Sequence, residues 1–251
     1  MEFYRRLPVD GMFNVRELGG YPTADGRVTR CGAFIRSEIP RKITAEGLAF
    51  LRNYGVVLSV DLRGLRETER MPSVLASQPW LRYRSIPAAN SQLAGGRAAK
   101  TPDRFVKWPE MYISMIDGHQ DWIRRVLSAM AEVETGAVIF NCTTGKDRTG
   151  MISAMLLGLA GVPDNDIIAD YCVSQVYMRP TYMELFRDMP GQNDALPADF
   201  GVDAPFFKTA PENMALLLEH INIEYGGIDR YLTLCGVTEE EKKALRKRLV
   251  G

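Results

Sequence analysis

The feature that most constrains this 251-residue chain is the stretch 137–150, in which an apolar run leads through a polar loop into a second apolar run. Ala137 to Phe140 has the length and composition of a buried strand, and Met151 to Ala160 is typical of a buried helix. The loop between them carries Cys142 and Arg148, with five residues between the thiol and the guanidinium. A loop that leads into a helix N-terminus points unpaired backbone N–H groups at one place, and the helix dipole favours an anion there. The stretch therefore predicts an anion site that contains a nucleophile.

The residues of this loop suit a phosphate dianion. The field that would hold the anion also stabilises a thiolate, so we expect the pKa of the Cys142 thiol to lie below its ordinary value. Gly145 lets the backbone curl without a Cβ in the way. Arg148 offers a planar fork for two phosphate oxygens, and Thr149 can hydrogen-bond the sulfur when it acts as a leaving group.

The loop sequence C-T-T-G-K-D-R-T-G resembles the signature of cysteine-dependent protein tyrosine phosphatases. Its Gly-Lys-Asp-Arg-Thr-Gly form is similar to a bacterial branch of tyrosine and dual-specificity phosphatases that includes a secreted mycobacterial enzyme. Two further segments, Asn14 to Tyr21 (N-V-R-E-L-G-G-Y) and Asp61-Leu62-Arg63, are similar to the same branch. The resemblance implies hydrolysis of phosphotyrosine, with phosphoserine, phosphothreonine and phosphoinositides as further substrates.

The resemblance also implies roles for the loop residues. Cys142 is expected to be the nucleophile, Arg148 to stabilise the transition state and Asp147 to be the general acid, in preference to Asp103 and Asp61. No cofactor and no metal are implied. The residues expected to bind the substrate phosphate are Thr143, Thr144, Gly145, Lys146, Thr149 and Gly150.

Three residues beside the loop leave questions open. Asn141 stands where the family usually has His before the nucleophile, and Asn cannot carry a charge. A catalytically silent phosphate-binding module is therefore an alternative to an enzyme. Asp61 and Arg63 end a second strand, so they either face the phosphate or form a salt bridge. Lys146 either binds a second phosphate of an inositol lipid or pairs with a carboxylate.

Composition excludes several other classes of function. The formal net charge is zero, from 31 basic and 31 acidic residues, which gives no indication of nucleic-acid binding. The four cysteines form no C-x-x-C pair, so neither a zinc site nor a disulfide framework is expected. The sequence shows no signal segment and no run of eighteen apolar residues, so we expect no stable membrane anchor. The default expectation is a cytoplasmic protein, although relatives can be exported without a cleaved signal. The expected partner is a phosphorylated protein or a phosphoinositide.

The remaining pattern predicts one α/β domain over residues 1–251, with a central, largely parallel sheet flanked by helices, as in protein tyrosine phosphatases. Residues 28–37 and 80–87 are expected to be strands, and residues 109–133 one long helix that can break at Asp117-Gly118. Residues 88–107, rich in Ala, Gly and Lys, are expected to form a mobile loop. Residues 180–209, interrupted by several prolines and glycines, are expected to be irregular and are a candidate lid.

Overall fold

A computed structural model describes residues 5–88, 108–188 and 201–251. They form a five-stranded sheet with the strand order β1-β2-β5-β3-β4. The inner pairs β2–β5, β5–β3 and β3–β4 are parallel, and only β1 at the edge pairs antiparallel with β2. The strands are β1 (Arg16–Glu17), β2 (Phe34–Ser37), β3 (Val56–Asp61), β4 (Arg82–Ser85) and β5 (Ala137–Asn141). The predicted α/β class and largely parallel sheet are confirmed.

The central strand β5 is buried on both faces, and its side chains alternate between two cores. Val138 and Phe140 belong to the larger core, whereas Ala137 and Ile139 belong to the smaller one. This is the expected environment of a parallel strand that is covered on both sides by helices. A continuous apolar run is therefore the correct sequence signal for β5.

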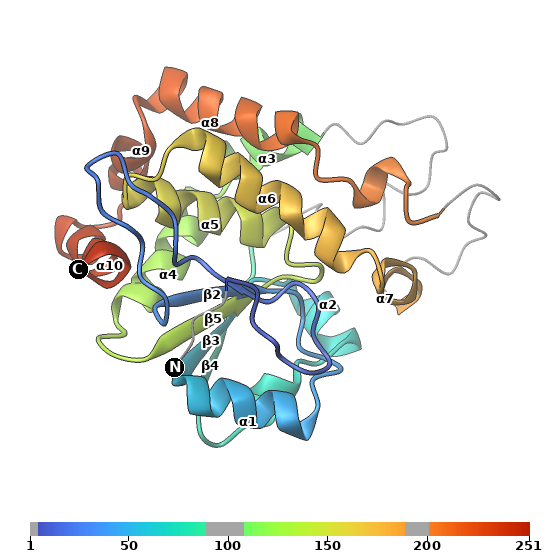
Figure 1. Ribbon diagram of the computed structural model, residues 1–251. Helices are drawn as coiled ribbons and strands as arrows, with labels where there is room; N and C mark the ends of the chain where they lie inside the picture. The colour runs from blue at the N-terminus through green and yellow to red at the C-terminus, as the bar shows by residue number, and fades with distance from the viewer. Residues whose placement is uncertain (1–4, 89–107, 189–200) are drawn as a thin grey trace.

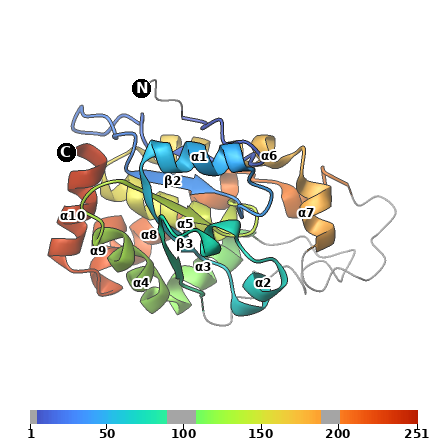
Figure 2. The same cartoon turned by 90° about the horizontal axis from the view of Figure 1, so that it is seen from below.

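The two faces of the sheet carry unequal layers (Figure 1). Figure 2, seen from below relative to Figure 1, shows α1 lying across that side of the sheet. Leu51 of α1 and Leu75 of the short helix η1 fill the smaller core. The larger core lies under the other helices, with the apolar α5 next to β2 and β5. The helices of the described residues are α1 (Ala45–Tyr54), α2 (Leu65–Arg70), η1 (Val74–Ser77), α3 (Trp108–Gly118), α4 (Gln120–Ala131), α5 (Asp147–Leu159), α6 (Asp164–Met178), α7 (Tyr182–Asp188), η3 (Pro205–Phe207), α8 (Pro211–Tyr225), α9 (Ile228–Leu234) and α10 (Glu239–Val250).

Several boundaries differ from the sequence prediction. The strand predicted over 28–37 is shorter in the structure and spans Phe34–Ser37. Gly32 has a left-handed backbone with φ of 80°, which interrupts the extended conformation before Phe34. The helix predicted over 109–133 is divided into α3 and α4 at Gly118, where a break was anticipated. The segment 180–209 contains the helix α7 and the 3-10 turn η3, so its described part is more regular than predicted.

Two predictions concern residues that the structure does not describe. The predicted mobile loop lies outside the described residues apart from Ala88, and so does the 189–200 part of the candidate lid. Among the helices in the described ranges, none has both the length and the apolar character needed to cross a membrane.

Candidate active site

The loop 142–146 lies at the carboxyl edge of the sheet, between the last residue of β5 and the first residue of α5. Ser37 and Asp61, at the ends of the neighbouring strands, are level with Asn141 in the sheet register. Gly145 has φ of 72°, and a Cβ there would lie 2.5 Å from the carbonyl oxygen of Ser37. Only glycine fits this turn, which directs the loop into the N-terminus of α5. The Cys142 side chain is thereby placed where the loop amides and the helix dipole converge.

Arg148 is held in one orientation by Glu67 of α2. The two terminal nitrogens of its guanidinium donate to the two carboxylate oxygens of Glu67, each at 2.7 Å, in a bidentate pair. Burial alone would raise the pKa of Glu67, but the charge of Arg148 outweighs it and lowers the pKa to about 2. Thr143 also donates to Glu67, at 2.6 Å. One carboxylate therefore fixes both the loop and its arginine.

Two side-chain donors in the first turn of α5 have no hydrogen-bond partner among the described residues. They are Nε of Arg148 and Oγ1 of Thr149, and both are buried. Buried polar groups are normally paired, so each calls for a partner that arrives from outside the chain. A phosphoryl group bound in the loop would supply acceptor oxygens for Arg148, and a thiolate would accept from Thr149.

A buried charge cluster supports the loop from behind. Arg36 of β2 donates to the Gly145 carbonyl oxygen at 2.7 Å and forms a salt bridge with Asp170 of α6. Arg16 of β1 binds the same carboxylate at 2.8 Å. The positive charges of both arginines outweigh burial and hold the pKa of Asp170 well below its usual range. On the outer side, Asn14 Nδ2 donates to the Thr144 carbonyl oxygen at 3.0 Å.

Asp147, the first residue of α5, is held by two side chains. The hydroxyl of Tyr112 donates to its Oδ1, and Lys146 Nζ lies 3.0 Å from the same oxygen. The Tyr112 hydroxyl is also 2.9 Å from that of Tyr171. The Asp147 carboxyl is thus fixed at the start of α5, directly after the loop.

Lys146 is buried, with 1% of its surface exposed. Its ammonium lies 3.8 Å from the ring centroid of Trp108, a cation–π contact, in addition to its salt bridge with Asp147. Of the two roles considered for Lys146, the pairing with a carboxylate is the one present in the structure.

Asn141 contacts the loop through its amide. Its Nδ2 donates to the Cys142 carbonyl oxygen at 3.2 Å, whereas its buried Oδ1 has no partner among the described residues. Asn141 therefore supports the backbone of Cys142, but it brings no charge toward the sulfur.

Asp61 and Arg63 bind each other rather than the loop. Both side chains are fully buried and form a salt bridge of 2.7 Å. Arg63 also donates to the Met71 carbonyl oxygen at 2.7 Å, and Tyr83 donates to Asp61 at 2.8 Å. These contacts fix the chain after β3, from which α2 carries Glu67 to the loop.

The structure adds contacts that the sequence did not reveal. Glu67, Asp170, Tyr112 and Tyr171 approach the loop from α2, α6 and α3, and none was predicted to do so. The only local signal for Glu67 is an acidic residue in the first turn of a helix after a strand, three residues beyond Gly64. Arg36, a charged side chain in the buried strand β2, has Asp170 as its partner.

Aromatic side chains cover the loop on the side of α3 and α7. Trp108 contacts Phe206 at 5.8 Å between ring centroids, Phe206 contacts Phe207 at 5.3 Å, and Tyr182 stacks on Phe207 at 4.5 Å. Cys142 beneath is only 2% exposed. We call these four residues, Trp108, Phe206, Phe207 and Tyr182, the aromatic cover.

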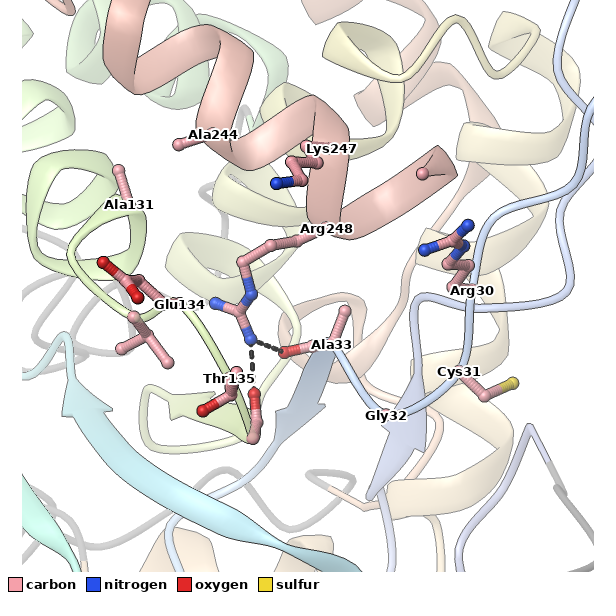
Figure 3. Close-up of a pocket in the computed structure, with 13 residues that line it drawn as sticks. Arg30, Cys31, Gly32, Ala33, Ala131, Glu134, Thr135, Ala244, Lys247 and Arg248 are labelled. Atoms are coloured by element: carbon pink, nitrogen blue, oxygen red, sulfur yellow. Dashed lines mark hydrogen bonds between the residues drawn. The ribbon is translucent and has the colours of Figure 1, made fainter.

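A cavity of about 880 Å³ lies at the opposite edge of the sheet, next to the start of β2 and β5. Arg248 of α10 crosses it and donates to the carbonyl oxygens of Ala33 and Gly136 (Figure 3). Its guanidinium thus joins α10 to the sheet at the amino ends of the strands, whereas the loop lies at their carboxyl ends.

Two further predictions can be compared with the described residues. The four cysteines, for which no disulfide framework was expected, are free thiols in the structure. Within residues 5–88, 108–188 and 201–251 there is no group of three or more His, Cys, Asp and Glu side chains arranged to hold a metal ion.

Known proteins resemble this chain over most of its length. A tyrosine-protein phosphatase of Nostoc commune is 31% identical over 223 residues, which are 86% of this chain and 74% of that protein. The triple specificity protein phosphatase PtpB of Mycobacterium tuberculosis is 23% identical, over 98% of this chain and 99% of that protein. Among solved structures, Pseudomonas aeruginosa TpbA in complex with pTyr is 16% identical, with 76% of this chain and 86% of that chain covered and a TM-score of 0.29.

The family assignment rests on the sequence matches. The model of the tyrosine phosphatase family matches residues 7–251, which include the loop, Glu67 and the helices that support them. This chain belongs to the tyrosine phosphatase family.

Proposed function

We propose that this protein hydrolyses phosphotyrosine through a cysteinyl-phosphate intermediate. The observation that carries the proposal is the joint placement of Cys142 and Arg148. The thiol lies at the start of a loop that ends in a helix N-terminus, and the guanidinium is fixed beside it by Glu67 with its Nε left unpaired. This arrangement suits a phosphoryl dianion and a nucleophile that attacks it.

In the first step, the Cys142 thiolate attacks phosphorus, the S–P bond forms and the bond from phosphorus to the tyrosyl oxygen breaks. Asp147 gives its proton to that oxygen, so tyrosine leaves neutral. The loop N–H groups of residues 143–148 and the Arg148 guanidinium hold the phosphoryl oxygens, most tightly in the transition state.

In the second step, water attacks the phosphorus of the cysteinyl-phosphate and the S–P bond breaks. Asp147, now a carboxylate, takes a proton from the water, and the Thr149 hydroxyl donates to the departing sulfur. Phosphate is released and the thiolate is restored. The unpaired Oγ1 of Thr149 supports this role.

The decisive test is hydrolysis of aryl phosphates by the wild type and two variants. Cys142→Ser should abolish vanadate-sensitive turnover. Asp147→Asn should reduce kcat by roughly a hundredfold for a poor leaving group such as phenol, and by less for an activated nitrophenol, because only the poor leaving group depends on the proton. Asp166→Asn on α6 is the matched control. Wild-type turnover equal to that of Cys142→Ser would reject the enzyme and favour a silent phosphate-binding module.

Phosphoinositide hydrolysis at the same site is the second candidate, and Lys146 tests it. Because its ammonium is already bound to Asp147 and to the Trp108 ring, the contacts favour phosphotyrosine. Lys146→Ala should therefore change kcat/KM for a phosphotyrosine peptide and for a panel of phosphoinositides by the same factor. A selective loss with the lipids would assign Lys146 to lipid recognition instead.

A further inference from the structure

Tyr182 of α7 places a buried hydroxyl in the aromatic cover. The residue is 1% exposed, and its ring stacks on Phe207 with 4.5 Å between centroids and 24° between planes. Its hydroxyl has no hydrogen-bond partner among the described residues. Other buried tyrosines here are paired: Tyr231 donates to the Ile116 carbonyl oxygen and Tyr112 to Asp147. The lack of a partner distinguishes Tyr182.

The surroundings of Tyr182 place it above the candidate active site. The stack on Phe207 continues through Phe206 to Trp108, whose ring lies on the Lys146 ammonium. Burial raises the pKa of Tyr182, and the negative charges of Asp147 and Cys142 are close enough to raise it further. The hydroxyl therefore stays protonated at neutral pH and is available as a donor near the nucleophile.

Three buried polar groups without partners belong to the loop's helix and to the aromatic cover next to it. They are Nε of Arg148, Oγ1 of Thr149 and the hydroxyl of Tyr182, contributed by α5 and by α7. Leaving a buried donor unpaired is unfavourable, and a bound ligand that carries acceptors would supply the missing partners. A phosphoryl group has three non-bridging oxygens, more than Arg148 alone engages.

We propose that the Tyr182 hydroxyl donates a hydrogen bond to a non-bridging phosphoryl oxygen of the substrate and thereby positions it over Cys142. The inference rests on the proposed function, because it assigns a further contact to the same phosphoryl group. It makes α7 a part of the substrate site.

The test is Tyr182→Phe, which removes the hydroxyl and retains the ring and its stack on Phe207. We expect kcat/KM for an aryl phosphate to fall about tenfold, the effect of one lost hydrogen bond to a charged group. Inhibition by orthovanadate, which occupies the phosphoryl position, should weaken by a similar factor. The melting temperature should not fall, because the hydroxyl that is removed has no partner in the free protein.

Tyr231→Phe on α9 is the matched control. It removes a buried hydroxyl that donates to Ile116 at 2.7 Å, so it should lower the melting temperature and leave kcat/KM unchanged. The proposal is overturned if Tyr182→Phe retains wild-type vanadate affinity, whatever its turnover, or if its kcat/KM rises, which would mean that the hydroxyl obstructs the substrate.

Failure of the proposed function gives a different result. In that case the wild type shows no turnover above Cys142→Ser, and the role of Tyr182 is judged from vanadate binding alone. Thermal stabilisation by vanadate, measured for the wild type and Tyr182→Phe, then decides: weaker stabilisation of the variant supports the contact, and equal stabilisation rejects it.

Discussion

At the scale of single residues, Glu67 determines where Arg148 points. An arginine side chain has many rotamers, and two hydrogen bonds to the Glu67 carboxylate select one of them. Both partners are buried, so neither charge has water as an alternative partner. Loss of either charge leaves the other uncompensated, which is more costly than the loss of a surface pair.

We therefore predict that Glu67→Gln lowers both activity and stability. The free energy of unfolding, measured with urea at pH 7, should fall by about 3 kcal/mol, since the buried Arg148 cation loses its counter-charge. The kcat/KM for an aryl phosphate should fall at least tenfold because Arg148 is no longer held in one orientation. Glu69→Gln, an exposed position on the same helix, should change neither quantity. Unchanged stability in Glu67→Gln would contradict this account.

The same carboxylate predicts a dependence of stability on pH. The pKa of Glu67 is lowered from 4.5 to about 2 in the folded protein, so the unfolded chain takes up the proton first as the pH falls. The contribution of Glu67 is complete above pH 4.5 and is lost between about pH 4.5 and 2. Acid unfolding of Glu67→Gln should show a shallower loss of stability across this range than the wild type; parallel curves would contradict the assignment.

At the scale of elements, the loop is supported by a chain of contacts that joins β1, β2 and α6. Asp170 of α6 forms salt bridges with Arg16 and Arg36. Arg36 in turn donates a hydrogen bond to the Gly145 carbonyl oxygen of the loop. None of these residues needs to touch a substrate. They act by keeping the loop amides directed at one place, which is the preorganisation that transition-state stabilisation requires.

Asp170→Asn should therefore weaken catalysis from a distance. It leaves two buried guanidinium groups close together without their shared anion, so the free energy of unfolding should fall by about 3 kcal/mol or more. The kcat should fall more than KM changes, because the loop is less well ordered when charge develops in the transition state. Asp166→Asn, in the first turn of α6, is the control. A variant that is destabilised and yet retains wild-type kcat would show that Asp170 serves stability only.

At the scale of the whole molecule, the residues at the two ends of the parallel strands have different roles. The carboxyl edge carries the loop, Glu67 and the aromatic cover, while at the other edge Arg248 joins the C-terminal helix α10 to the starts of β2 and β5 (Figure 3). Arg248 also donates to the Met130 carbonyl oxygen and lies 4.6 Å from the Phe34 ring centroid. Burial lowers its pKa to about 10, which keeps it charged at neutral pH.

We predict that Arg248→Met separates stability from activity. The variant retains an apolar stem but loses the three hydrogen bonds that Arg248 donates to carbonyl oxygens, so the free energy of unfolding should fall by about 2 kcal/mol. The kcat/KM should remain that of the wild type because the change lies at the edge away from Cys142. Lys247→Met, an exposed neighbour that lines the same cavity, should affect neither. A loss of activity in Arg248→Met at full stability would contradict this division.

The sequence by itself determined the features that depend on neighbours along the chain. The strand, loop and helix around Cys142, the turn at Gly145 and the placement of Arg148 at a helix N-terminus all follow from local backbone preferences and spacing. The alternation of apolar strands and helices was sufficient for the parallel α/β class. Where local signals were weak, as at residues 28–37, the prediction was too long, because one left-handed glycine ends the extended backbone.

Only the tertiary structure decided which distant groups meet at the loop. Glu67 lies 81 positions before Arg148, and Asp170 lies 134 positions after Arg36. No local sequence pattern encodes such pairs. A buried charge needs an opposite charge nearby, and the packing of distant elements decides which residue supplies it. The same holds for Asp61 and Arg63, which could have faced the phosphate and instead bind each other, and for Tyr182, whose hydroxyl lies in the aromatic cover because α7 packs there.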